Sequence, residues 1–278
     1  RHTRLQGDWS SDVCSSDLTL SGGITGPGPL TVVGPGTLTV TGAGEYTGAT
    51  TVASGTLALA GGGSMASSSA LTVALGAELD ITGITGMVTY AGTLSGEGDV
   101  TLGDKVLVLA QTAEGSFSGV IGGVGGGLTI NTGSSGTLLL SGINTYTGPT
   151  VISGGGLGLT GTGSIASSSS VTVDGTFDVS GATADATLKD LSGSGSIILG
   201  VNDLTILQDD KLVFSGVISG ASGGDFILDV ASTGELSLGG ENTYDGKTII
   251  NGGKLTIAST GSIASSSGVE VYDVLSIE

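Results

Sequence analysis

Acidic and lysine side chains gather in one part of the chain, where they could support calcium binding or polysaccharide cleavage. Carboxylates bind Ca²⁺, and a lysine beside bound calcium can act as the base of a lyase. Such a lyase also needs an arginine for its substrate carboxylate, and from residue 19 onward the sequence contains none. Acids spread over loops are typical of a solvated surface, so we predict no catalytic residue, metal or other cofactor. The residues concerned are Asp185, Asp190, Asp203, Asp209 and Asp210, with Lys189 and Lys211 beside them.

Serine runs are the next candidates for chemistry, as nucleophiles. The run ASSS begins at Ala66, Ala166 and Ala264. A serine nucleophile needs a histidine base, and the one histidine, His2, lies in the opening stretch. Recurrence at three equivalent places favours a turn. The glycine clusters lack the lysine of a phosphate-binding loop, so no nucleotide site is predicted.

The opening stretch, residues 1–18, contains the only cysteine and the only tryptophan, Cys14 and Trp9. Reverse translation of Asp8–Leu18 gives a DNA string that resembles a sequencing-library adapter, so we expect residues 1–18 to be an assembly artefact outside the fold. Residues 19–278 then form a single domain, with 22 acidic residues against five lysines. This charge excludes nucleic-acid binding through a basic patch.

Internal repeats give the strongest signal of architecture. Three blocks of 34 residues, at 36–69, 136–169 and 234–267, align without gaps and start 100 and 98 residues apart. Segments between them also correspond, as FSGVIGG from Phe117 does to FSGVISG from Phe214. The chain therefore holds nearly three copies of a unit of about 98 residues.

The local pattern within each unit is that of β-strands. Stretches such as TLTV, TLAL, ELDI and TFDV alternate apolar and polar residues, and Gly, Ser, Asn or Thr clusters separate them. A linear repeat of short strands favours a parallel β-solenoid, in which each coil stacks on the next. At roughly 20 residues per coil, we expect about thirteen coils.

The stretch GTLLLSGINTYTGPTVISGG from Gly136, with its relatives at Gly36 and Gly234, resembles the passenger-associated transport repeat, also called the autotransporter-associated β-strand repeat. The first block has Gly44 where the pattern has Asn. The matching positions are Asn144, Tyr146, Gly148 and Thr150 in the second block, Asn242, Tyr244, Gly246 and Thr248 in the third, and Tyr46, Gly48 and Thr50 in the first.

This resemblance implies a right-handed parallel β-helix, the passenger of a type V secreted autotransporter at the outer membrane or cell surface of a Gram-negative bacterium. Its partner in the same protein would be a C-terminal outer-membrane β-barrel. Neither a signal peptide nor that barrel is found in the sequence, so we expect an internal fragment.

The function that this implies is structural and non-enzymatic: the coils support vectorial folding during export, and the outer face serves adhesion or self-association. Partners would be glycans or proteins of host or bacterial surfaces, or other copies of the chain. The asparagines and tyrosines of the motif either line a carbohydrate-binding strip or, as we favour, pack structurally. Alternatives are the scaffold of a secreted lyase-like carbohydrate-active enzyme with its active site elsewhere, a calcium-stabilised module, and a phage or pilus fibre.

Overall fold

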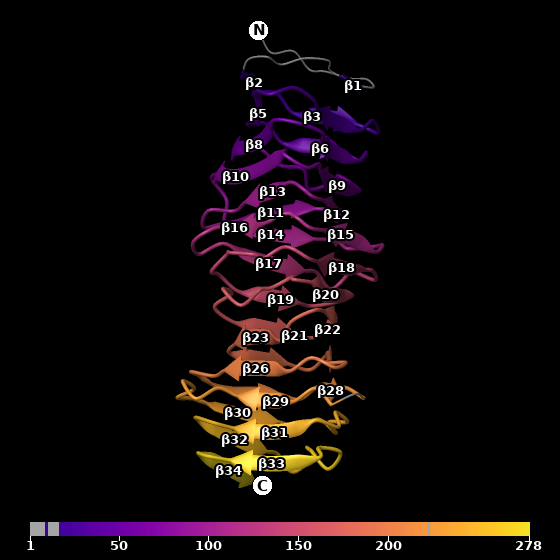
Figure 1. The fold of residues 1–278 in the computed structure, drawn as a ribbon. Coiled ribbons are helices and arrows are strands. Elements are labelled where there is room, and N and C mark those ends of the chain that lie inside the picture. The colour runs from indigo at the N-terminus through magenta and orange to yellow at the C-terminus, as the bar shows by residue number, and fades with distance from the viewer. Residues whose placement is uncertain (1–8, 11–16, 222) are drawn as a thin grey trace.

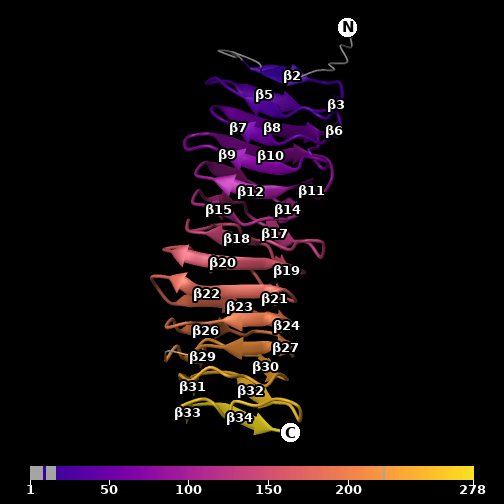
Figure 2. The same ribbon diagram turned by 90° about the vertical axis from the view of Figure 1, so that its right-hand side faces the viewer.

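The chain winds into a rod of stacked coils, shown from two sides in Figures 1 and 2. The computed structural model describes residues 9–10, 17–221 and 223–278. These residues form strands and no helix, and they make a parallel β-solenoid of about 12 turns. The all-β parallel solenoid predicted from the sequence is confirmed.

Three lines of strands run along the rod as its faces A, B and C. Face A is the 11-stranded sheet, followed by an isolated bridge between Glu241 and Ser262. Its strands are, in order, β1 (Trp9–Ser10), β4 (Leu30–Val32), β7 (Thr50–Val52), β9 (Ala70–Val73), β12 (Thr93–Gly96), β15 (Gly115–Phe117), β18 (Thr137–Leu140), β20 (Gly156–Gly161), β22 (Thr176–Ala182), β25 (Ser196–Ile198) and β28 (Val217–Ser219).

Face B is a six-stranded sheet, a bridge between Ile143 and Ser164, and a five-stranded sheet. The six strands are β2 (Leu18–Leu20), β5 (Thr37–Val40), β8 (Thr56–Gly61), β10 (Glu78–Ile84), β13 (Asp99–Thr101) and β16 (Ile121–Gly122). The five strands are β23 (Ala186–Lys189), β26 (Leu204–Leu207), β29 (Phe226–Leu228), β31 (Lys247–Ile250) and β33 (Gly268–Val271).

Face C begins with a two-stranded sheet and continues with the 10-stranded sheet. The pair is β3 (Ile24–Gly26) and β6 (Gly44–Tyr46). The ten are β11 (Val88–Ala91), β14 (Val106–Leu109), β17 (Gly127–Ile130), β19 (Thr150–Ile152), β21 (Val171–Val173), β24 (Leu191–Gly193), β27 (Lys211–Phe214), β30 (Glu235–Leu238), β32 (Lys254–Ile257) and β34 (Val274–Ile277).

Alternation along each strand places one set of side chains inside the rod, in contact with the same set from the coils before and after. On face B, Leu57 pairs with Leu79 and Leu79 with Val100, and all three are at most 1% exposed. Such ladders fill one continuous apolar core along the described part of the chain. Because the strands are short and the ladders repeat, contacts between neighbouring coils dominate the packing.

The sequence repeat and the coil do not have the same length. Paired residues on successive coils are 18 to 24 residues apart, as for Ala186 with Leu204 and Lys211 with Glu235. A unit of 98 to 100 residues therefore covers about four and two-thirds coils. Equivalent strands accordingly move by one face per unit: β5 lies on face B, β18 on face A and β30 on face C.

The expected boundary at residue 18 falls where face B begins. Strand β2 starts at Leu18, and the Asp17 carboxylate accepts a hydrogen bond from the Thr37 amide at 3.0 Å. Strand β1 pairs with β4, while residues 1–8 and 11–16 lie outside the described residues. That residues 1–18 are an artefact stays a prediction. No helix in the described ranges has the length and hydropathy needed to cross a bilayer.

Replacing a large interior side chain tests the ladder packing. Phe177 is fully buried and pairs with Leu157 on one side and Ile197 on the other. Phe177→Ala should lower the free energy of unfolding by about 3–5 kcal/mol, because it removes apolar contacts and leaves a cavity. Leu75→Ala, at a position 76% exposed, is the control and should change it by less than about 0.5 kcal/mol. Equal effects of the two changes in denaturant unfolding would contradict this packing.

Candidate functional site

The repeat motif forms the same buried chain of hydroxyl groups three times. The Tyr146 hydroxyl lies 2.7 Å from Thr150 Oγ1, which donates to Ser168 Oγ at 2.9 Å. Ser168 in turn donates to the carbonyls of Gly148 and Ser170, at 2.9 and 3.0 Å. This Tyr–Thr–Ser hydroxyl chain links a tyrosine inside the rod to the backbone of the next coil.

The first and third units repeat this arrangement with similar distances. Tyr46 lies 2.6 Å from Thr50, and Thr50 lies 2.8 Å from Ser68. In the third unit the Tyr244–Thr248 distance is 2.6 Å, and Thr248 donates to Ser266 at 3.1 Å. The three tyrosines are at most 2% exposed and the three threonines are fully buried.

Burial changes the acidity of these tyrosines. Loss of water around the hydroxyl raises the pKa of Tyr244 to about 12, and the hydrogen bond to Thr248 opposes this only in part. The same cause raises the pKa of Tyr46 and of Tyr146. The hydroxyls therefore stay protonated at physiological pH and act as hydrogen-bonding groups, not as bases.

The motif asparagines are buried too, at positions where strand pairing stops. Asn144 Oδ1 accepts from the Ile121 amide at 2.9 Å, and Nδ2 donates to the carbonyls of Gly142 and Ser164, both at 3.1 Å. Asn242 makes the same three bonds with Ile218, Gly240 and Ser262. The side-chain amide thus joins three successive coils in place of a ladder of backbone hydrogen bonds.

Gly44 shows what happens where this asparagine is missing. Strand β6 there pairs directly with β3, and the Gly44 amide donates to Ser64 Oγ at 3.0 Å. A Cβ atom at Gly44 would collide with the Ser64 carbonyl oxygen. The motif glycines are restricted in the same way, because a Cβ at Gly48, Gly148 or Gly246 would collide with the backbone of the preceding coil.

Taken together, these contacts place the motif residues inside the rod and between coils. A carbohydrate-binding strip built from Asn144, Tyr146, Asn242 and Tyr244 would need exposed rings and amides, whereas all four are at most 3% exposed. The motifs also lie on different faces: Tyr46 is on face C, and equivalent positions shift by one face per unit. The geometry therefore supports a packing role for the motif residues, as we propose below.

Sequence reasoning missed two kinds of buried polar residue. Ser68, Ser168 and Ser266 complete the hydroxyl chains, and their fixed position within the ASSS runs was the available signal. Gln111 and Gln208 are fully buried, and each accepts a backbone amide through Oε1, at 3.1 Å from Leu94 and Leu191. Their spacing of one repeat unit was the only sign of a shared role.

The acidic residues at 185–210 serve mainly as acceptors for backbone amides of the following coil. Asp185 accepts from the Asp203 amide at 3.0 Å, and Asp203 accepts from Asp225 at 2.8 Å. Asp190, whose φ of 43° is left-handed, accepts from the amides of Asp209 and Asp210 at 2.9 and 3.1 Å. Among the described residues, no three His, Cys, Asp or Glu side chains are grouped so that they could hold a metal ion.

One glutamate is held between two lysines on face C. Glu235 lies 2.9 Å from Lys211 and 3.2 Å from Lys254, which come from the coils on either side, and it accepts from Thr256 at 2.8 Å. The bonds to Lys211, Thr256 and Lys254 lower the pKa of the Glu235 carboxyl to about 2. This group therefore remains ionised across the physiological range.

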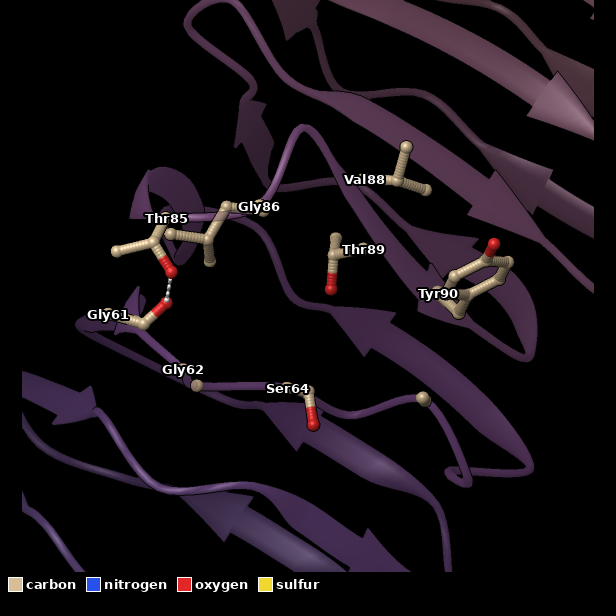
Figure 3. A pocket seen from close by; sticks show the side chains of 11 residues that line it. Gly61, Gly62, Ser64, Thr85, Gly86, Val88, Thr89 and Tyr90 are labelled. Carbon is tan, nitrogen blue, oxygen red and sulfur yellow. Dashed lines mark hydrogen bonds between the residues drawn. The ribbon is translucent and has the colours of Figure 1, made fainter.

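A pocket of about 190 Å³ lies between the coil of Ser64 and strand β11 (Figure 3). The glycines Gly61–Gly63 form one side, and Val88, Thr89 and Tyr90 form the other. Thr85 Oγ1 donates to the Gly61 carbonyl at 3.0 Å at one end of the pocket. None of the residues expected to be functional from the sequence lies here.

Comparison with known proteins matches the motif to an established family. The family model described as Passenger-associated-transport-repeat matches residues 30–59, 132–159 and 230–257. The Adhesin BmaC autotransporter of Brucella suis biovar 1 (strain 1330) is 34% identical over 246 residues. The match covers 80% of this chain and 7% of that protein. No solved structure matches.

The chain is an autotransporter passenger region. It carries three passenger-associated transport repeats, and proteins of this class are found at the outer membrane and cell surface of Gram-negative bacteria. The chain spans less than a tenth of the length of the relative.

The passenger repeats coincide with the hydroxyl chains, apart from the serines. Each match includes the tyrosine and the threonine, but the matches end at residues 59, 159 and 257, before Ser68, Ser168 and Ser266. The serine comes from the next coil, since its residue number is 18 higher than that of its threonine. The passenger-repeat motif is therefore completed by a residue that its own sequence pattern does not include.

Removing one tyrosine hydroxyl should destabilise the passenger region in a pH-dependent way. Tyr244→Phe should cost about 0.5–1.5 kcal/mol at neutral pH, because the hydrogen bond to Thr248 is lost. The folded-state pKa of Tyr244 is raised to about 12, so the contribution of this hydroxyl is complete below pH 10 and falls as the pH rises to 12. The difference between wild type and variant should therefore narrow over that range in unfolding experiments. Tyr272→Phe, at a site 71% exposed, is the control; a constant difference up to pH 12 would contradict the assignment.

Acid should remove the contribution of Glu235. Its folded-state pKa of about 2 is below the usual value of 4.5, so its contribution to stability is present above pH 4.5 and lost as the pH falls towards 2. Glu235→Gln should lower the melting temperature at pH 7 and leave it unchanged at pH 2. The exposed Glu114 provides the control, Glu114→Gln, which should alter neither value. A Glu235→Gln effect that is the same at both pH values would show that charge is not involved.

Proposed function

We propose that this passenger region is a non-enzymatic rod whose coil-by-coil stacking supports its folding as it emerges from the outer membrane. The observation that carries the proposal is the recurrent Tyr–Thr–Ser hydroxyl chain, which ties each repeat to the coil that follows. All contacts of this chain are made within 20 residues, so each new coil can add to a folded neighbour without waiting for distant parts. Outside the cell there is no ATP, and the free energy of this stepwise packing opposes backward movement.

The motif residues take a packing role in this proposal. Asn144 and Asn242 satisfy backbone groups where strands stop, and the tyrosines fill the interior. Burial of these groups supports that role, and the same burial argues against their contact with an external ligand. In the whole protein, the partner of the passenger would be a C-terminal outer-membrane β-barrel.

Adhesion or self-association is the use that we propose for the outer surface. The relative is described as an adhesin, and the long parallel rod presents exposed side chains on three faces. Its partners would be glycans or proteins of host or bacterial surfaces, or further copies of the rod. The net charge of −18 disfavours anionic partners such as nucleic acid.

Surface display tests the folding role. The passenger region is joined to an autotransporter β-barrel, and its delivery is measured on intact Gram-negative cells with an antibody and external protease. Tyr146→Ala should lower the free energy of unfolding by about 3–5 kcal/mol, because a fully buried ring is lost, and should reduce the amount of protease-resistant passenger outside.

Tyr272→Ala is the matched control, since this tyrosine is 71% exposed, and it should leave display unchanged. Full delivery of the Tyr146→Ala passenger, despite measured destabilisation of the purified region, would overturn the folding role.

A further inference from the structure

Face C of the rod is interrupted between its first two strands and the 10-stranded sheet. Strand β6 pairs with β3, whereas β11 is the terminal strand of the 10-stranded sheet and pairs with β14. The pocket of about 190 Å³ occupies this interruption, with Gly62 and Ser64 opposite β11 (Figure 3). It is a slot in the wall of the solenoid, at a place where no ladder joins the two coils on face C.

The edge of β11 that faces the slot offers backbone hydrogen-bonding groups. The carbonyls of Met87 and Ala91 accept from Val106 and Ala110 on the other side, at 2.8 and 2.9 Å. The backbone N–H and C=O groups of successive residues point to opposite edges of a strand. Those of Val88 and Tyr90 therefore point away from β14, towards the slot. Both residues line the slot. Its wall therefore carries donors and acceptors two residues apart.

Thr89 adds a polar side chain at the floor of the slot. It is 3% exposed, and its Oγ1 is the one buried side-chain polar atom in the described part of the chain without a hydrogen-bond partner. Figure 3 shows this oxygen pointing towards Ser64. A buried hydroxyl without a partner is unfavourable, and such atoms are rare in folded proteins.

A hydroxyl at this inward position distinguishes the first unit from the second. Strand β11 directs Thr89 and Ala91 inward and exposes Val88 and Tyr90, which are 40% and 50% exposed. In the second unit, Ala186 of β23 takes the place of Thr89, because it pairs with Leu204 as Thr89 pairs with Leu107. Ala186 is buried, and the next residue, Thr187, is exposed. The first unit thus places a hydroxyl where the second places apolar packing.

We propose that this slot binds one neutral sugar residue. No charged side chain lines it, whereas Thr85 and Thr89 supply hydroxyls and the half-exposed Tyr90 supplies an aromatic face. A sugar ring combines hydroxyls with an apolar C–H face, and pockets of this composition suit such ligands. Thr89 completes its hydrogen bonding with a sugar hydroxyl, and Tyr90 packs on the ring. The proposal names a class of ligand for the adhesive role proposed above. Only the biological use of the site rests on that role.

Saturation-transfer NMR on the full chain tests the site, with methyl β-glucoside, methyl β-galactoside and N-acetylglucosamine as probes and glucuronate as the charged comparison. A ligand of this size in a small slot should bind with a Kd on the order of 1 mM. Thr89→Val should weaken binding about tenfold while keeping or raising the melting temperature, because the unpaired hydroxyl is gone. Tyr90→Ala should abolish binding, and Thr187→Val, at an exposed site on β23, should leave it unchanged.

Several results would overturn the proposal. One is the absence of saturation transfer from the folded chain to any of the three neutral probes when the probe is present at about ten times the expected Kd. Another is binding that Thr89→Val and Thr187→Val leave equally strong. A third is capture of a short extended peptide along β11 in preference to the sugars. Each of these would leave the surface-display result unaffected, so a failed sugar site is distinguishable from a failed folding role.

Discussion

Every coil of this rod must satisfy its backbone hydrogen bonds with the coil about 20 residues away, and this requirement governs the rest of the structure. A parallel ladder does so along the strands, but strands of two to seven residues end soon, and corners follow. At those places the chain uses side chains: Asn144 and Asn242 at interruptions of a face, Gln111 and Gln208 inside the rod, and aspartates at exposed turns. Much of the polar sequence is thereby explained as support for the backbone.

The same polar contacts give the stack its register. Leu, Val and Ile are interchangeable within an apolar ladder, so the core alone discriminates weakly between two alignments of neighbouring coils that differ by two residues. A buried asparagine or a Tyr–Thr–Ser hydroxyl chain is satisfied in one alignment only, and a shift would leave several buried groups without partners. We infer that the recurrent motif specifies how coils align, while the apolar ladders supply most of the stability. This role in alignment explains why the residues of the motif keep the same spacing in each unit.

The fold could be predicted from the sequence because repeats, strand alternation and turn residues all agreed. Details that depend on coil length could not be predicted. We expected about thirteen coils from the sequence, and the structure has about 12 turns. The burial of Tyr146 and Asn144 was one of two interpretations, since both residue types also suit a binding surface. The slot beside β11 gave no signal, because alternation in VTYA is compatible with either face pointing inward. The serines of the hydroxyl chains were recognised as turns but not as partners of a tyrosine in another coil.

The mismatch between unit and coil has a consequence for how such passengers change in evolution. Duplication or deletion of one unit by recombination turns everything beyond it by a third of a revolution about the rod axis, since each unit advances the pattern by one face. Gain or loss of three units returns the distal part to its original orientation about the rod axis. Gain and loss of single units therefore re-aim distal surface features without altering any local contact, whereas the spacing between features along the axis changes in proportion to length.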